Sequence, residues 1–250
     1  MENTERLDDL QLKGYRIWQD SRLFCFSVDA VLLADFATVR KGDRVCDLCS
    51  GNGIIPILLA ANTRAAHITG VEIQEPSWKL ALRSMELNGL QERVDMRCMD
   101  AMNAPEELGR GRFQAVLCNP PFKPAGDGIP SQRPEMYIAR HEALIQLDGI
   151  LQTASALLCP LGRFAIIHRP ERLSDLLCGM RRERMEPKRL RMVQPTAQKA
   201  PTMVLVEGVK DARPGGLQVE PPLVVHDGQG GYTQEIRRIY RRDEWEKKGE

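Results

Sequence analysis

The sequence predicts an α/β fold, in which helices cover both faces of a mainly parallel, twisted sheet. Two observations support this prediction. From Arg44 onward, short apolar runs typical of strands alternate with longer helical patterns, as they do in parallel sheets. In addition, acidic, amide and glycine residues stand directly after these runs, where the strands of such sheets end and where ligands bind.

The expected strands follow one another along the chain. Five runs are expected to be parallel strands: 44–48 (RVCDL), 67–73 (HITGVEI), 93–98 (RVDMRC), 113–118 (FQAVLC) and 162–168 (GRFAIIH). The run 202–208 (TMVLVEG) is expected to be an antiparallel C-terminal strand, with 185–193 (MEPKRLRMV) as its partner. These strands define the sheet.

Helical patterns lie between these runs. We expect helices over 29–37, from Ile55 onward, over 76–89 and over 141–158. Pro56 suits a first helical turn, and Asn88 with Gly89 suits a helix end. In the helix over 76–89, one face can hold four apolar residues: Trp78, Leu82, Met85 and Leu87.

The chain divides into three expected parts. Residues 1–40 form a hairpin and helix that pack on the core, and residues 41–210 form the main α/β domain. Residues 211–250 form a C-terminal extension rich in Pro, Gly and charge, which ends in a short helix.

Composition narrows the classes of protein. With 250 residues, 42% hydrophobic, 28% charged and a net charge of +1, the chain is an ordinary globular protein without a general basic character. Local basic patches remain at 181–191, with six basic and two acidic residues, and at 237–248, with six and three. A charged run is often only a solvated surface, so neither patch by itself defines a binding site.

Targeting and metal signals are weak. The N-terminus carries charge instead of an apolar signal core, and no run has the length of a membrane span, so we expect a cytoplasmic protein without membrane contact. Seven cysteines include the pair in CDLC, 46–49, but no second pair completes four ligands. We therefore expect no metal.

The candidate site residues all follow the ends of expected strands. Glycines allow tight turns and close approach of a ligand, and a carboxylate can accept hydrogen bonds from ribose hydroxyls. Pro56 stands where a dinucleotide fingerprint requires a third glycine, which weakens a pyrophosphate site. In chain order the residues are Asp47, Ser50, Gly51, Gly53, Glu72, Asp100 and Asn119.

These motifs resemble a known family. FSVDAVLLADFA, DLCSGNGIIPILLA, GVEIQ, CNPPF and YIARHE, between residues 10 and 208, are similar to Rossmann-like class I S-adenosylmethionine-dependent methyltransferases with an NPPF motif. More narrowly, they resemble the bacterial family that methylates the N6 amine of an adenosine beside the anticodon of tRNA(Val). The resemblance implies S-adenosylmethionine as cofactor, held by Asp47, Ser50, Gly51, Gly53, Glu72, Ile73, Asp100, Ala101 and Asn119. Cys49 departs from the superfamily pattern, which often has glycine there.

Physical reasoning gives the NPPF stretch a catalytic role. The amine of adenine is a poor nucleophile because its lone pair is delocalised into the ring. Two acceptors, the side-chain oxygen of Asn119 and the carbonyl of Pro120, would favour a pyramidal nitrogen with a free lone pair. Pro120 and Pro121 have restricted φ and hold this turn rigid, and Phe122 offers a face on which the base stacks. A plain rigid turn is the structural alternative.

The expected partner is a tRNA. Lys123, Arg133 and Arg140, in a Gly- and Pro-rich loop, are candidates for phosphate contacts, and so are Arg181 and Arg182 of the first basic patch. Phe26 and Asp29 either cover the site or are a core ring and a helix cap. We expect no DNA substrate, because no inserted target-reading domain is evident, and we expect a monomer.

Three alternatives remain open from the residues. A ribosomal RNA guanine N2 methyltransferase also suits NPPF but would carry a duplicated N-terminal half. A release-factor glutamine methyltransferase would carry a larger helical domain before residue 44. A non-catalytic RNA- or protein-binding module of the same fold would not need the complete set of Asp47, Glu72, Asp100 and Asn119.

Overall fold

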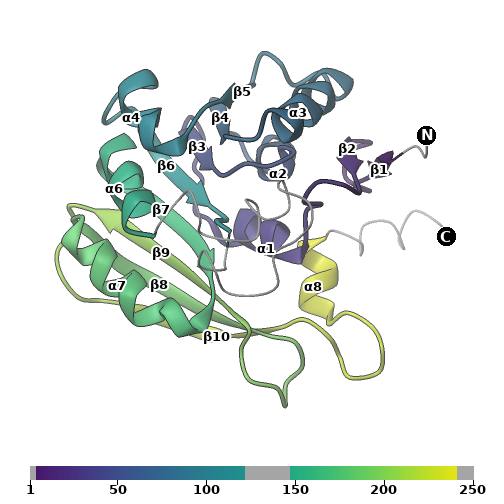
Figure 1. Ribbon diagram of the computed structural model, residues 1–250. Helices are drawn as coiled ribbons and strands as arrows, with labels where there is room; N and C mark the ends of the chain where they lie inside the picture. Colours follow the sequence, from purple (N-terminus) through teal and green to yellow (C-terminus); the bar gives the residue numbers. More distant parts are fainter. Residues whose placement is uncertain (1–3, 122–146, 241–250) are drawn as a thin grey trace.

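One mixed sheet of eight strands forms the centre of the protein (Figure 1). The computed structural model describes residues 4–121 and 147–240. Across the sheet the strand order is β10-β8-β9-β7-β6-β3-β4-β5, and among the described strands of this sheet β9 runs against its neighbours. The bounds are β3 Arg44–Leu48, β4 His67–Glu72, β5 Val94–Cys98, β6 Phe113–Cys118, β7 Leu158–His168, β8 Met185–Gln194, β9 Met203–Lys210 and β10 Gln218–Val224.

The expected strands are confirmed, including the antiparallel pair of β8 and β9. The central strands alternate their side chains between two apolar layers. Val45 and Leu117 face one layer, whereas Cys46 and Cys118 face the other. The sheet is therefore buried on both faces, as expected for parallel strands.

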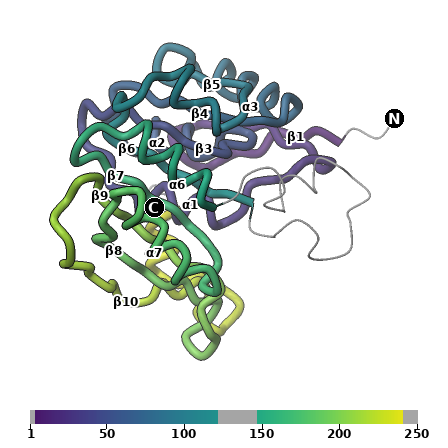
Figure 2. The backbone as a smooth tube through the Cα atoms, turned by 60° about the vertical axis from the view of Figure 1, so that its left-hand side comes forward, coloured from purple at the N-terminus to yellow at the C-terminus, as the bar shows by residue number. Residues whose placement is uncertain are grey.

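Helices cover both faces of the sheet (Figures 1 and 2). On the face of Val45 lie α1 Val28–Phe36, α2 Ile54–Asn62, α3 Glu75–Leu87 and α8 Gln234–Ile239. On the face of Cys46 lie α4 Ala104–Glu107, α6 Leu147–Leu157 and α7 Leu173–Arg182. Among these described helices, none is long and apolar enough to cross a membrane.

An N-terminal hairpin packs against α3. Strand β1 Glu5–Asp9 pairs with β2 Arg16–Asp20 in antiparallel register. The hairpin expected within residues 1–40 is present, and the partner of β2 is the charged stretch ERLDD. Because most side chains of this stretch are charged, a pattern of apolar runs does not predict the strand.

The hairpin also changes which face of α3 is buried. Met85 is buried, but Leu82 and Leu87 are 39% and 38% exposed, so the predicted apolar face is wrong. The buried face instead includes Ser77 and Ser84, and the Ser84 hydroxyl oxygen accepts a hydrogen bond from the Trp18 backbone amide of β2 at 3.0 Å. Small polar residues let the hairpin backbone approach the helix closely.

The segment after β9 extends the sheet. Strand β10 pairs in parallel with β8, and Ile236 of α8 is fully buried in the core beside α1. Arg189 of β8 fixes this region: its guanidinium stacks on Phe36 at 4.3 Å and contacts Glu207 and Glu220 at 3.1 and 2.8 Å. Residues 211–240 thus pack on the main domain.

The strand order reverses between β3 and β6. From β3 the chain adds β4 and β5 on one side, and then returns to place β6 on the other side of β3. In open α/β sheets a ligand binds beyond the carboxyl ends of the two strands at such a reversal. We call this side of the sheet the carboxyl edge.

Candidate functional site

The loop between β3 and α2 forms the centre of the carboxyl edge. Three of its residues adopt positive φ: Cys49 at 61°, Gly51 at 57° and Gly53 at 83°. The Ser50 amide donates to the Val71 carbonyl of β4 at 2.9 Å, which holds the loop against the sheet. Cys49 thus occupies a left-handed conformation that favours glycine, although it carries a side chain.

The two glycines serve different purposes. A Cβ atom on Gly53 would lie 2.7 Å from Met85 Cε and 3.2 Å from Ala81 Cβ, so this glycine lets α2 begin directly against α3. A Cβ atom on Gly51 would meet nothing within 4 Å. Gly53 therefore serves packing, whereas Gly51 borders open space where a ligand can approach the backbone.

Asp47 is a fully buried carboxylate at the end of β3. Its Oδ2 accepts a hydrogen bond from the Ser50 hydroxyl at 2.6 Å, whereas its Oδ1 is buried and has no hydrogen-bond partner among the described residues. Burial raises the pKa of Asp47 to about 8; the Ser50 hydrogen bond opposes this rise, and the Glu72 carboxylate adds to it. A donor at Oδ1, above all a cationic one, would relieve this cost.

Glu72, at the end of β4, ties the loop to the next turn. One carboxylate oxygen accepts from the Gly51 amide and the other from the Gln74 amide, each at 2.7 Å. Burial raises the pKa of Glu72, and backbone amides of Gln74, Gly51 and Ile73 oppose the rise. Each oxygen retains an acceptor position for a ligand hydroxyl.

Asp100 follows β5 at the same edge. Its Oδ1 accepts from the Met102 amide at 2.9 Å, and this bond caps the short 3₁₀ turn Ala101–Asn103. Ala101 is buried beneath that turn, and Ile73 is half-buried after β4. The predicted cofactor residues are therefore brought together along the ends of β3, β4 and β5.

Asn119 stands at the end of β6, next to β3. Leu117 is the register partner of Asp47, and alternation along β6 places Asn119 on the same face as Leu117. The Asn119 Oδ1 atom is buried without a hydrogen-bond partner among the described residues, and Pro120 behind it is buried. Two buried acceptor oxygens, on Asp47 and Asn119, thus lie on neighbouring strands without donors.

The other predicted contact residues fall into two groups. Phe122, Lys123, Arg133 and Arg140 lie outside the described residues. Arg181 and Arg182 end α7, which runs back from the end of β7 to the start of β8, so they lie at the opposite edge of the sheet. They also form ion pairs, with Glu186 at 3.1 Å and with Asp148 at 2.7 Å.

Sequence reasoning missed the contact between the hairpin and this loop. The Asn52 side-chain amide donates to the Trp18 carbonyl at 3.2 Å, and Asn52 itself is buried. This bond attaches β2 to the loop that carries Ser50 and Gly51. The motif GNG could have indicated a role for its middle residue, but its partner lies too far away in the sequence to be inferred.

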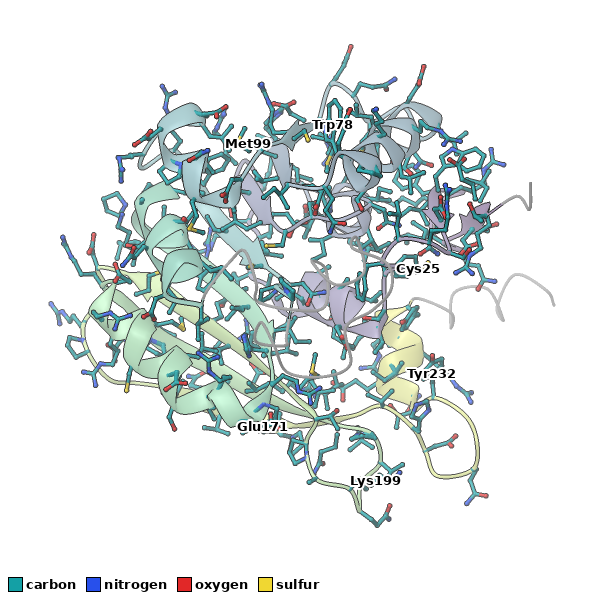
Figure 3. All side chains as sticks on the ribbon, in the orientation of Figure 1. Cys25, Trp78, Met99, Glu171, Lys199 and Tyr232 are labelled. Atoms are coloured by element: carbon teal, nitrogen blue, oxygen red, sulfur yellow. The ribbon has the colours of Figure 1, made fainter. Side chains whose placement is uncertain are left out.

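His168 and Asp29 also lie near the carboxyl edge. His168 ends β7, is fully buried, and its Nδ1 accepts from the Arg169 amide at 2.8 Å. Asp29, in the first turn of α1, accepts from the Ser27 hydroxyl at 3.0 Å, and burial raises its pKa, an effect that this bond and the Arg169 charge oppose. Loops after β5, β7 and β8 carry Met99, Glu171 and Lys199 (Figure 3).

The fold and this edge of the sheet define a methyltransferase. The chain belongs to the methyltransferase small domain family, whose model matches residues 16–169. It is 27% identical to the tRNA1(Val) (adenine(37)-N6)-methyltransferase of Porphyromonas gingivalis over 243 residues, 93% of each chain. It is 28% identical to the enzyme of the same name from Aliivibrio fischeri, over 86% of this chain and 88% of the relative.

Solved structures share the fold. A predicted O-methyltransferase from Agrobacterium tumefaciens superposes with a TM-score of 0.68 at 22% identity, over 85% of this chain and 95% of that chain. TYW2 of Pyrococcus horikoshii in complex with MeSAdo superposes with a TM-score of 0.59 at 15% identity, over 84% and 73%. At these identities the likeness establishes the fold alone.

The different roles of the two glycines can be separated by substitution. We expect Gly53→Ala to lower the free energy of unfolding by about 2 to 4 kcal/mol, because positive φ and the clash with Met85 both oppose a Cβ atom. Gly51→Ala is the matched control and should cost about 1 kcal/mol, from backbone conformation alone. Urea unfolding measures both, and equal losses would contradict this assignment.

The buried Asp47 carboxyl makes stability depend on pH. Its pKa is about 8 in the folded protein and near 3.8 when unfolded, so the folded state binds the extra proton between these values. Its stabilising contribution is complete below pH 3.8 and is lost as pH rises through 8, at up to about 1.4 kcal/mol per pH unit.

We expect Asp47→Asn to flatten this fall in the free energy of unfolding between pH 5 and 8. A smaller slope should remain, because the pKa of Glu72 is raised as well. Asp175→Asn, at an exposed side chain of α7, is the control and should leave the slope unchanged. Equal slopes in the wild type and Asp47→Asn would show that Asp47 is ionised in the folded state.

Proposed function

We propose that this protein transfers a methyl group from S-adenosylmethionine to the N6 amine of adenine 37 in tRNA1(Val). The reaction is the one named for its full-length relatives, which align with 86–93% of the chain. The observation that carries the proposal is the buried Asn119 Oδ1 at the start of the Pro120–Pro121 turn, which has no hydrogen-bond partner among residues 4–121 and 147–240. An amine is the kind of donor that this oxygen lacks.

The residues of the carboxyl edge fit this cofactor. The free Oδ1 of Asp47 suits the ammonium of its methionine part, and the remaining acceptor positions of Glu72 suit its ribose hydroxyls. Asp100 suits the amine of its adenine. When bound, S-adenosylmethionine supplies an electrophilic methyl group on a positively charged sulfur.

Asn119 and Pro120 prepare the nucleophile. The Asn119 Oδ1 and the Pro120 carbonyl accept the two hydrogens of the target amine, so its lone pair turns out of the ring plane. With its lone pair freed, the target nitrogen would be ready to accept the methyl group that bound S-adenosylmethionine would supply. The nitrogen afterwards loses one proton to water, so the scheme uses no side chain as general base. Alignment by the stiff turn is the main catalytic contribution.

Phe122, Lys123, Arg133 and Arg140 remain proposals for contacts with the base and its phosphates. Among the described residues, Arg169 and Lys199 are better placed for the tRNA backbone than Arg181 and Arg182. Arg169 follows β7 and contacts Glu171 only at 3.8 Å, and Lys199 is exposed in the loop between β8 and β9 (Figure 3). His168, at the end of β7, is the register partner of Val204 near the start of β9. Arg169 and the loop that carries Lys199 therefore both flank the carboxyl edge. A tRNA substrate places this activity in the bacterial cytoplasm.

The reaction is tested by methyl transfer from labelled S-adenosylmethionine to tRNA that lacks its own modification, with nucleoside analysis of the product. N6-methyladenosine at position 37 of tRNA1(Val) is the expected product. Cofactor binding without transfer to tRNA would overturn the proposed substrate, and ribosomal RNA and release factors would be assayed next.

Asn119→Ala tests the acceptor role. We expect kcat to fall at least 100-fold, as when one preorganised hydrogen-bonding group is removed from other active sites, while affinity for S-adenosylmethionine changes less than threefold. Asn119→Asp retains an acceptor oxygen and should keep more activity than the alanine variant. Full turnover by Asn119→Ala would remove Asn119 from the mechanism.

Charge reversal tests where the tRNA lies. Arg169→Glu with Lys199→Glu should weaken tRNA binding at least tenfold at low salt and reduce the salt dependence of binding. Arg181→Glu with Arg182→Glu changes the net charge equally, but these residues are ion-paired at the opposite edge, so we expect less than a twofold effect. Filter binding across a salt series measures the tRNA affinity of both double variants. A larger loss of affinity in the Arg181 and Arg182 variant would place the tRNA contact at α7.

A further inference from the structure

Three thiols gather where β3 and β6 end. Cys46 and Cys118 are buried on the face covered by α6, and the partly exposed Cys49 packs against the same cluster. A lone buried cysteine generally acts as a small apolar residue. Here a partly accessible thiol lies beside a buried one, which is the arrangement of a cysteine pair that can be oxidised.

The strand register brings Cys49 and Cys118 within bonding range. Leu48 is the register partner of Cys118, and Cys49 is the next residue along β3. With neighbouring strands about 4.8 Å apart and a rise of about 3.3 Å per residue, their Cα atoms are separated by about 6 Å. Disulfides span Cα separations of about 4.4–6.8 Å, a range that includes this separation. The two side chains already interact.

Both cysteines adjoin residues of the site. Cys49 immediately precedes Ser50 and Gly51, and the positive φ of Gly51 depends on the loop geometry. Cys118 immediately precedes Asn119. A covalent bond between them would fix the cofactor loop to the strand that carries the amine acceptor. The left-handed backbone of Cys49 has little freedom to adjust once such a bond forms.

We propose that Cys49 and Cys118 form a redox-sensitive pair, which a hydroperoxide oxidises to a disulfide that reversibly blocks cofactor binding. The Cys49 sulfur attacks the peroxide, the O–O bond breaks, and a sulfenic acid and an alcohol or water form. The Cys118 sulfur then displaces the hydroxyl as water, and the S–S bond forms. In total, two thiols lose two electrons and two protons, and one peroxide is reduced.

The different burial of Cys49 and Cys118 gives the two thiols different roles in the oxidation. Burial raises the pKa of Cys118 well above its usual value, and the neighbouring Cys49 thiol raises it further, so Cys118 is a poor initial nucleophile. The partly exposed Cys49 therefore reacts first, and Cys118 resolves the sulfenic acid from within the core. This order also protects Cys49 from further oxidation.

The inference rests on the cofactor site of the proposed function, and it can be tested without tRNA. The purified full chain is treated with hydrogen peroxide, free thiols are alkylated, and peptides are identified by mass spectrometry. We expect a linked peptide pair joining Cys49 to Cys118, an affinity for S-adenosylmethionine at least tenfold lower by calorimetry, and recovery of both states with dithiothreitol.

Matched variants separate this pair from other thiols. Cys98→Ser with Cys178→Ser removes two exposed thiols and should leave the response to peroxide intact. Cys49→Ser and Cys118→Ser, each compared with its own untreated form, should lose it. The proposal would be overturned if peroxide oxidised Cys98 and Cys178 without linking Cys49 to Cys118. It would also be overturned if the linked protein kept its affinity for S-adenosylmethionine. Failure of the reduced wild type to bind S-adenosylmethionine would instead count against the proposed function.

Discussion

Two buried carboxylates, on Asp47 and Glu72, hold the loop between β3 and α2 in place, and the rest of the site depends on this loop. Burying a carboxyl group without hydrogen bonds costs several kcal/mol, so the hydrogen-bonded oxygens of these side chains restrict the loop around them. Glu72 fixes Gly51 and Gln74, and Asp47 fixes Ser50. The loop can then keep three positive φ angles and leave open space beside Gly51. Within the described part of the chain, one oxygen of Asp47 has no hydrogen-bond partner, so a ligand donor at this position would complete the site.

The N-terminal hairpin supports the same loop from outside the sheet. Asn52 contacts the Trp18 carbonyl, and the Trp18 amide contacts Ser84 on α3, so one strand joins the loop to a helix. Arg83 of α3 lies over the Trp18 ring at 4.2 Å and adds a cation–π contact. The hairpin therefore belongs to the structure that forms the site, although it lies before the first strand of the main sheet.

Sequence predicted the central fold well because its signals are local. The runs that became β3, β4, β6 and β7 are apolar and short. Asp47 and Glu72 lie at strand ends, and Asp100 and Asn119 come just after strands, in the order that a parallel sheet requires. The missed elements depend on distant partners. Strand β1 is charged and exists because β2 pairs with it, and α3 buries serines because the hairpin covers them. The basic run at Arg181 and Arg182 was assigned to the substrate from composition alone, which does not reveal at which edge of the sheet a helix ends.

The proposed acceptor pair at Asn119 and Pro120 would define a reaction more narrowly than a substrate. Two oxygens aimed at the hydrogens of a planar amine suit adenine, guanine or a glutamine amide equally, because all three present an NH₂ group conjugated to a π-system. Selection among them must come from surfaces that contact the remainder of the substrate. At the carboxyl edge, the described residues offer the loops after β7 and β8, where Arg169 and Lys199 can contact a phosphate backbone. Such contacts suit the regularly spaced phosphates of an RNA, whose affinity would fall with salt. The position of these charges therefore favours a nucleic acid, and the single-stranded anticodon loop lets an adenine reach Asn119 at little unstacking cost.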